Sequence, residues 1–237
     1  MTSLTGAIVL VTGANGGIGT HLVHEALARG AAKVYATARS PRTWGDKRIV
    51  PLTLDVTDAA SIAAAVEAAP DVTVLINNAG ASPASASLLT LPEQEIRSNM
   101  ETNFFGPLLL ARGFAPVLKG HNDAAIINIH SLLSWYATAG VYSVSKAALW
   151  SATNALRLEL APEGVHVLGV HVGWVDTAMA AHTPDPKLQP GVLVTRVFDA
   201  LEAGEYEVLA DEASVQVKAG LSADIEDLYP QLKATNP

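Results

Sequence analysis

The feature that most constrains this chain is a regular alternation of short, continuously apolar runs with amphipathic stretches. Seven runs of strand length, rich in Val and Ile, lie at Ala7–Thr12, Lys33–Thr37, Ile49–Leu54, Val72–Asn77, Ala124–His130, Val165–Val172 and Glu205–Leu209. Their length and lack of alternation are typical of strands buried on both faces. Helical stretches lie between them at Gly17–Arg29, Ala59–Ala68, Pro92–Leu118, Tyr142–Leu160 and Gly191–Ala203. This order predicts an α/β fold, a doubly wound parallel sheet of about seven strands with helices on both faces.

Length and composition are compatible with one domain of this kind. A doubly wound sheet with its helices commonly reaches 237 residues, and 49% apolar against 16% charged residues supplies a large core. No stretch is rich enough in Pro, Gly or Ser to act as a linker. We therefore expect a single domain over residues 1–237, in which residues 221–237 form a C-terminal tail.

The charge balance and the missing cysteines exclude several classes of function. A net charge of −8 repels the phosphates of nucleic acids and of anionic lipids, so we expect neither nucleic acid nor membrane as a partner. Without cysteine there is no disulfide, thiolate metal site or cysteine nucleophile. The histidines lack the spacing of metal ligands, so we expect no metal site.

The N-terminus gives no sign of export. It lacks the basic start and apolar stretch of a signal peptide, and no later run approaches the ~20 apolar residues of a membrane span. We expect a cytoplasmic protein.

A glycine-rich turn follows the first apolar run. Gly13, Gly17 and Gly19 are spaced G-x-x-x-G-x-G between a predicted strand and a predicted helix. Glycine lets the backbone turn sharply and lets a phosphate approach closely, and the N-terminus of the helix favours an anion. The turn therefore predicts a dinucleotide site with contacts from Gly13, Asn15, Gly16, Gly17, Ile18 and Gly19.

The end of the second predicted strand indicates which dinucleotide binds. In dinucleotide folds an acidic residue there bonds the ribose hydroxyls and selects NAD. This chain has no carboxylate at that place; Arg39 stands there, with Ser40 and Arg42 as possible helpers. A guanidinium donates two parallel hydrogen bonds to a phosphate, so Arg39 predicts that the cofactor is NADP(H).

A tyrosine and a lysine occur four residues apart at Tyr142 and Lys146. On a helix this spacing places both side chains on one face. A nearby ammonium stabilises phenolate and lowers the pKa of a phenol, which can then exchange a proton with a carbonyl or alcohol oxygen. Tyr229 and Lys233 have the same spacing, but Pro230 lies between them and they fall in the terminal tail. We therefore select the first pair.

Together these motifs resemble those of the short-chain dehydrogenase/reductase family. The resemblance extends from Thr5 to about Lys218 and includes the glycine turn, Asn77–Gly80, Ser131, Tyr142–Lys146 and Gly173–Thr177. It implies a Rossmann-like fold and reversible hydride transfer between NADP(H) and a ketone, aldehyde or secondary alcohol.

The resemblance also implies further contacts to the cofactor. Asp55 and Val56 would flank the adenine, and Asn78, Ala79 and Gly80 would lie along the adenine ribose. After the sixth strand, Gly173, Val175 and Thr177 would meet the nicotinamide carboxamide or the phosphates. Val172 stands where the family usually has proline.

By the same resemblance, the catalytic group is Asn103, Ser131, Tyr142 and Lys146. Tyr142 would transfer the proton, and Ser131 would orient the carbonyl, with Ser134 as an alternative. Lys146 would hold the ribose and lower the pKa of the phenol. Asn103 would hold a water that connects to the lysine.

The substrate side is less sharply defined. Residues 178–190, with three prolines, are expected to form a mobile lid. An apolar pocket is expected from Ser131, Leu132, Leu133, Tyr136, Trp174 and Met179. No charged residue stands out there to bind a carboxylate or phosphate, so the expected substrate is a neutral, fairly apolar carbonyl compound.

Two other functions remain open at this point. One is an NAD-dependent alcohol dehydrogenase, which Arg39 disfavours; the other is a non-catalytic nucleotide-sensing protein on the same fold, which the intact Tyr142 and Lys146 disfavour. A nucleotide-sugar epimerase fits the glycine spacing poorly. The family resemblance further implies a homodimer or homotetramer. The apolar stretches Phe104–Leu118 and Ala147–Leu160 would suit such an assembly, but burial within the monomer explains them equally well.

Overall fold

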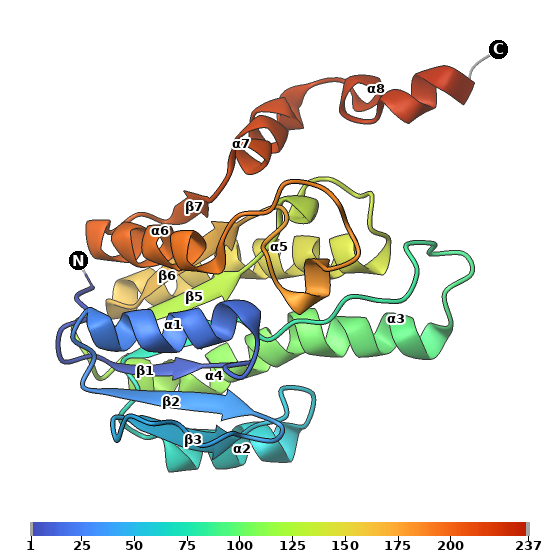
Figure 1. Ribbon diagram of the computed structural model, residues 1–237. Helices are drawn as coiled ribbons and strands as arrows, with labels where there is room; N and C mark the ends of the chain where they lie inside the picture. The colour runs from blue at the N-terminus through green and yellow to red at the C-terminus, as the bar shows by residue number, and fades with distance from the viewer. Residues whose placement is uncertain (1, 236–237) are drawn as a thin grey trace.

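The computed structural model describes residues 2–235, so Met1 and the last two residues of the predicted tail lie outside the described residues. Its centre is a seven-stranded parallel sheet in the order β3-β2-β1-β4-β5-β6-β7 (Figure 1). The strands are β1 (Ile8–Val11), β2 (Lys33–Ala38), β3 (Ile49–Thr53), β4 (Val74–Asn77), β5 (Ala125–Ile129), β6 (His166–His171) and β7 (Glu207–Leu209). The predicted doubly wound α/β fold is confirmed; six strands are shorter than their apolar runs, and β2 extends one residue further, to Ala38.

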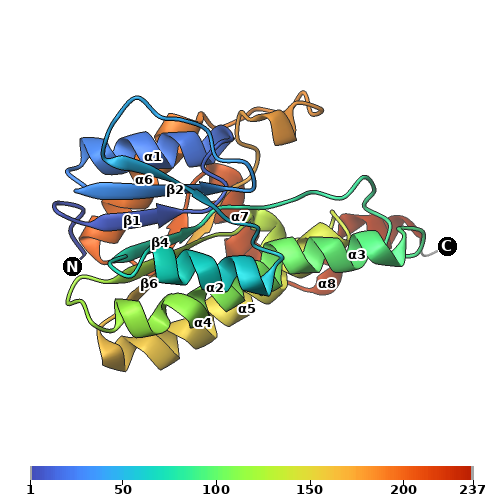
Figure 2. The ribbon, with the colours of Figure 1, turned by 90° about the horizontal axis from the view of Figure 1, so that it is seen from below.

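Helices cover both faces of the sheet (Figure 2). One face carries α1 (Gly17–Ala28) and α6 (Pro190–Ala203); the other carries α2 (Ala59–Ala68), α4 (Gly106–Leu118) and α5 (Val141–Leu160). Two apolar clusters fill the layers between sheet and helices, with Phe198 fully buried in one and Phe114 in the other. This double burial explains why the strands read as continuous apolar runs.

The stretch Pro92–Leu118, predicted as one helix, is divided. It consists of α3 (Glu93–Met100), a π-helical turn over Glu101–Phe105, and α4. Pro107 has no N–H to donate to the preceding turn, and the N–H of Gly106 bonds to the carbonyl of Glu101, five residues back. The wider turn brings Asn103 to the interior, where its side chain is fully buried.

The C-terminal part is more structured than expected. Asp211 caps α7 (Glu212–Ala219) by accepting a hydrogen bond from Ser214 N at 2.8 Å, and the predicted tail contains α8 (Ile225–Leu228). Figure 1 shows α7 and α8 leading away from the layers of the sheet. Within residues 2–235, no helix combines the length and the apolar character that crossing a membrane requires.

Candidate active site

The predicted site residues gather at the carboxyl ends of four neighbouring strands, β1, β4, β5 and β6. Parallel strands all end at the same edge of a sheet, and ligands of open α/β sheets bind beyond that edge. Thr12, Asn78, Ser131 and Gly173 each follow one of these strands. Segments that are far apart in the sequence therefore meet there.

Thr12 joins the glycine turn to the turn after β4. Its Oγ1 accepts hydrogen bonds from the backbone N–H groups of Asn78 and Ala79, both at 2.9 Å. In return, Asn78 Nδ2 donates to the Thr12 carbonyl at 2.8 Å. In the sequence Thr12 marks only the end of the first apolar run; in the structure it holds two predicted cofactor segments side by side.

The glycine turn forms a cradle that side chains would fill. A Cβ on Gly19 would collide with the carbonyl oxygen of Gly13, and a Cβ on Gly17 would lie 2.6 Å from Thr177 Cγ2. Gly17 also has a φ of +22°. The N-cap Gly16 offers no side-chain hydrogen bond to α1, so the first N–H groups of the helix stay available for an anion. These features fit a pyrophosphate, and Thr177 lies beside the turn.

Arg39 lies exposed just beyond the end of β2. Two hydrogen bonds from Thr57 lower the pKa of Asp55, and the charge of Arg39 acts in the same direction. Asn15 Nδ2 donates to the carbonyl of Ser40 at 2.8 Å, which joins the glycine turn to this segment. The Arg42 guanidinium instead lies over the ring of Trp44, 3.9 Å from its centroid.

The predicted catalytic side chains come together at the N-terminal part of α5. Lys146 is buried; its Nζ donates to the carbonyl of Ile129 at 2.8 Å and lies 5.7 Å from the centre of the Tyr142 ring. The Ser131 side chain lies near enough to Tyr142 to lower the pKa of its phenol. The Ser131 hydroxyl also bonds to the carbonyl of Val172 at 3.2 Å. Ser134, the alternative, is occupied instead in the small capping box that follows Ser131.

Burial governs the protonation of this group. Desolvation raises the pKa of Tyr142 to about 12, and the hydrogen bond with Ser131 opposes that rise. Desolvation also lowers the pKa of Lys146 to about 8. Both shifts favour the neutral forms. The Tyr142 phenol therefore keeps its proton and can act as an acid, and Lys146 loses its proton more readily than a lysine in water.

Asn103 occupies the interior of the site. Its Oδ1 accepts from Ala81 N at 2.8 Å, and its Nδ2 lies 2.9 Å from the carbonyl of Ala81 and 3.0 Å from Ser145 Oγ. A Cβ on Gly80 would lie 3.5 Å from Asn103 Oδ1 and 3.8 Å from Lys146 Nζ. Asn103 therefore connects the turn after β4 to α5, close to the lysine.

Two contacts fix the start of the segment that follows β6. Gly173 N donates to Asp211 Oδ2 at 2.7 Å, and Val175 pairs with Leu188 in an isolated bridge. The predicted lid, 178–190, thus leaves and returns at one place, with a short helical turn over Ala178–Ala180. Val172 takes the usual proline position without disturbing the turn.

The predicted substrate residues are only partly brought together. Leu132 Cδ2 lies against Gly173, at 3.0 Å from where a Cβ would stand. Leu133 is half-buried, and Met179 is 46% exposed on the lid. Tyr136 stacks on Tyr229, and Trp174 meets His182 edge-on. Two aromatic side chains assigned to the pocket therefore have other partners.

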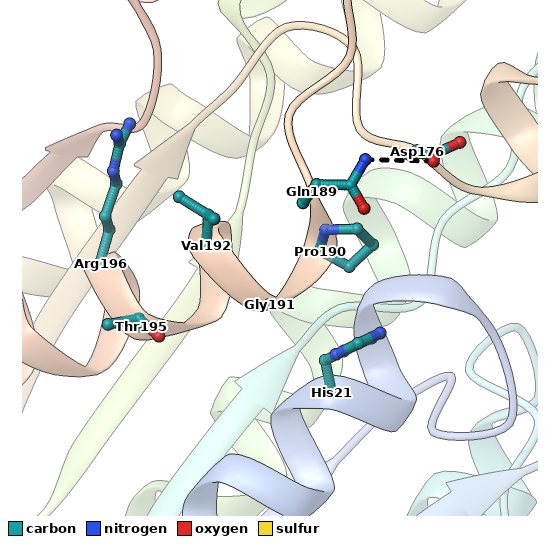
Figure 3. A pocket seen from close by; sticks show the side chains of 8 residues that line it. All are labelled: His21, Asp176, Gln189, Pro190, Gly191, Val192, Thr195 and Arg196. Atoms are coloured by element: carbon teal, nitrogen blue, oxygen red, sulfur yellow. Dashed lines mark hydrogen bonds between the residues drawn. The ribbon is translucent and has the colours of Figure 1, made fainter.

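A separate hollow of about 680 Å³ lies where the start of α6 meets α1 (Figure 3). Gln189 Nε2 donates to Asp176 Oδ2 across its rim at 3.2 Å. Its lining consists of His21, Asp176, Gln189, Pro190, Gly191, Val192, Thr195 and Arg196. None of the predicted cofactor, catalytic or substrate residues is among these, so the hollow is distinct from the predicted site.

Sequence reasoning missed a set of buried polar residues beneath the site. Asn77 and Asn128 are register partners on β4 and β5, and Asn77 Nδ2 donates to Asn128 Oδ1 at 2.8 Å. The signal was present, because asparagine interrupts otherwise apolar strands and a buried amide requires partners. Which partners it finds depends on the strand order, which the sequence pattern did not specify.

Comparisons with known proteins agree with this geometry. The family model for short chain dehydrogenases matches residues 7–187. A crystal structure of a short chain dehydrogenase from Burkholderia cenocepacia in complex with NADP is 38% identical, with a TM-score of 0.89 over 97% of this chain and 99% of that one. NADPH-bound carbonyl reductase from chicken fatty liver is 30% identical, with a TM-score of 0.77 over 85% and 92%.

A curated relative gives the same result from sequence. NADP-dependent 3-hydroxy acid dehydrogenase of Schizosaccharomyces pombe is 30% identical over 193 residues, which are 75% of this chain and 74% of that protein. A doubly wound sheet with a glycine cradle beside a Tyr–Lys pair defines a dinucleotide-dependent oxidoreductase. The chain belongs to the short-chain dehydrogenase family.

Proposed function

We propose that this protein transfers hydride between NADP(H) and a neutral, fairly apolar ketone, aldehyde or secondary alcohol. The observation that carries the proposal is the meeting of the Tyr142 phenol, the Ser131 hydroxyl that lowers its pKa, and the buried Lys146 one turn further along the same helix. The whole chain acts as a single domain, with residues 178–190 as the lid and 221–237 as the C-terminal tail.

The choice of NADP(H) rests on Arg39. Its exposed guanidinium can reach a 2′-phosphate, whereas a carboxylate at this place would have favoured NAD. The Burkholderia cenocepacia structure holds NADP, the chicken carbonyl reductase holds NADPH, and the Schizosaccharomyces pombe relative is NADP-dependent, in line with this assignment. The glycine cradle would take the pyrophosphate, and Asp55, Val56, Asn78, Ala79, Gly80, Gly173, Val175 and Thr177 would complete the contacts.

The chemistry follows from the position of the hydroxyl groups. Bound NADPH would supply the hydride. The Tyr142 phenol gives its proton to the carbonyl oxygen, while the Ser131 hydroxyl orients that oxygen by a hydrogen bond. Lys146 holds the ribose and favours the phenolate that remains. Lys146 can return a proton to the phenolate, and Asn103 would hold a water from which Lys146 recovers it.

Apolar side chains near Ser131 support the substrate class. Leu132, Leu133 and Met179 offer apolar surface, which suits a carbonyl compound without a charged group, whereas Tyr136 and Trp174 lie against Tyr229 and His182. We also propose assembly into a homodimer or homotetramer through α4 and α5, because Leu158 on α5 is 80% exposed and Phe105 beside α4 is 39% exposed.

A cofactor oxidation assay tests the proposal. NADPH and NADH are each supplied with a panel of ketones and aldehydes, and Tyr142→Phe is assayed beside the wild type. We expect NADPH to be oxidised with at least one substrate, and the variant to lose about 10²- to 10⁴-fold in rate. A preference for NADH would reject the role of Arg39. Tight NADPH binding without turnover would favour a sensing function.

A further inference from the structure

A buried chain of polar side chains leads to the backbone of Ser131. Asn128 Nδ2 donates to Thr153 Oγ1 at 2.8 Å, and Thr153 Oγ1 lies 2.9 Å from His130 Nε2. His130 Nδ1 lies 3.1 Å from His171 Nε2, and His171 Nδ1 lies 3.1 Å from the carbonyl oxygen of Ser131. All five residues are at most 5% exposed. Water therefore cannot replace any of these contacts.

The carbonyl at the end of this chain determines where the protons lie. A carbonyl oxygen only accepts, so His171 must carry its proton on Nδ1. Its Nε2 is then an acceptor, and His130 must carry its proton on Nδ1. The remaining acceptor, His130 Nε2, takes the hydroxyl proton of Thr153. The result is a one-directional series of donors that ends at Ser131.

The Leu149 carbonyl competes with His130 for the Thr153 hydroxyl proton, but it has another hydrogen-bond donor. In its shortest contact that hydroxyl donates to the carbonyl of Leu149, at 2.7 Å, against 2.9 Å to His130 Nε2. Inside α5, however, this carbonyl is the ordinary acceptor for the N–H four residues further on, so it keeps a partner when the hydroxyl turns to His130.

The surroundings hold both imidazoles neutral. Burial lowers the pKa of His130 well below its usual range and that of His171 to about 3. Three cations face the pair and add to this effect: Lys146 and Arg157 from α5, and Lys218 from α7. Glu207 on β7 lies 3.4 Å from His171 Nε2, but it is paired with Lys218.

The ring of His171 is also fixed in its plane. Trp135 stacks on it with ring centres 3.7 Å apart and an angle of 13°. A ring clamped in this way can direct its Nδ1–H at one backbone oxygen only. That oxygen belongs to the residue whose hydroxyl meets Tyr142.

We propose that His171 is a positioning residue, which holds the carbonyl of Ser131 through its Nδ1–H and so sets the Ser131 hydroxyl for the reaction. This inference rests on the proposed function, since it assigns the geometry of the same hydroxyl. The residue it positions contacts substrate, whereas His171 itself does not.

Two substitutions separate this role from a merely structural one. The amide nitrogen of asparagine and Nδ1 of histidine are the same number of bonds from Cα. The amide nitrogen of glutamine is one bond further away and corresponds to Nε2 of histidine. His171→Asn can therefore keep the donor to Ser131, while His171→Gln cannot. Both remove the imidazole and its stack on Trp135, so both should lower thermal stability to a similar extent.

The expected result is a difference in turnover between the two variants. We expect His171→Asn to keep kcat within about threefold of wild type, and His171→Gln to lose about tenfold or more, with NADPH binding unchanged in both. Equal losses, or equal activities, would overturn the proposal. If neither variant folds, nitrogen NMR of the wild-type imidazoles decides: a proton on Nε2 rather than Nδ1 of His171 rejects it.

The same NMR measurement separates the two proposals. Should the wild type reduce no carbonyl compound, the proposed function fails, and the tautomer of His171 still shows whether it holds Ser131. Should the wild type be active with His171 protonated on Nε2, the function stands and the positioning role fails.

Discussion

Tyr229 accepts a hydrogen bond on its phenol oxygen from the backbone N–H of Ala137, at 3.0 Å. Its ring also stacks on Tyr136, with centres 5.2 Å apart and planes within 6°. The predicted tail therefore contacts the loop that leads into α5, immediately before Tyr142. Of the second Tyr–Lys pair in the sequence, Tyr229 therefore packs against the rest of the domain, whereas Lys233 forms an ion pair with Asp227.

This contact predicts that the C-terminal segment influences substrate affinity. Tyr229→Ala should raise KM for the carbonyl substrate by about three- to tenfold, because one hydrogen bond and one aromatic stack of about 1 kcal/mol each are lost. Tyr229→Phe keeps the stack and should have a smaller effect. Steady-state kinetics with saturating NADPH measures both. A collapse of kcat in Tyr229→Phe would instead assign that phenol to catalysis.

Arg39 is expected to control cofactor choice. Arg39→Asp should weaken NADPH binding by about 10- to 100-fold, because a charge-assisted hydrogen bond contributes about 1.5–3 kcal/mol. It should strengthen NADH binding, because a carboxylate at this place can bond the ribose hydroxyls. Fluorescence titration of each cofactor measures the effect. Arg42→Ala is the matched control, since that guanidinium lies over Trp44. Equal losses in the two variants would contradict the assignment.

The glycine cradle is expected to tolerate a methyl group at one position and not at another. A Cβ on Gly19 would meet backbone atoms of Gly13 and Ala14, whereas one on Gly16 meets nothing within 4 Å. Gly19→Ala should therefore lower the free energy of unfolding by about 1–3 kcal/mol, and Gly16→Ala should not. Urea denaturation compares them. Similar stability in both would show that the turn can relax.

Stability should fall in mild acid because two buried histidines stay neutral in the folded state. The folded pKa of His171 is about 3, below its unfolded value near 6.5, so only the unfolded chain takes up the proton between these values. Stability is complete above pH 6.5 and declines below it by up to about 1.4 kcal/mol per pH unit for each such histidine. Urea titrations from pH 7 to pH 5 measure the slope, which His171→Asn should reduce. An unchanged slope would show that His171 contributes none of it.

The fold was predictable from sequence because its signals are local. Continuous runs of Val and Ile predict strands that are buried on both faces, and the spacing of Gly13, Gly17 and Gly19 predicts the turn after the first strand. The pairing of Tyr142 with Lys146 needed only the period of a helix. Each of these depends on a few adjacent residues.

The rest depends on contacts between distant segments. The π-helical turn at Glu101–Phe105 brings Asn103 to Ala81 and Ser145, and the sequence spacing of these residues contains no trace of that meeting. His130 and His171 lie 41 residues apart and pair only because β5 and β6 are neighbours. Tyr136 was assigned to the substrate pocket because of its position in the sequence. In the structure its ring stacks on Tyr229, the residue that follows α8.

The place of β1 in the sheet has a consequence for synthesis of the chain. Although it is the first strand made, β1 lies between β2 and β4, and Ile8 bonds to Thr73, 65 residues further on. At translation rates of about 5–20 residues per second, one edge of β1 remains unpaired for about 3 to 13 seconds after its emergence. During that time an apolar strand edge is open to wrong partners. Chaperone capture of the nascent chain should therefore be strongest before β4 leaves the ribosome.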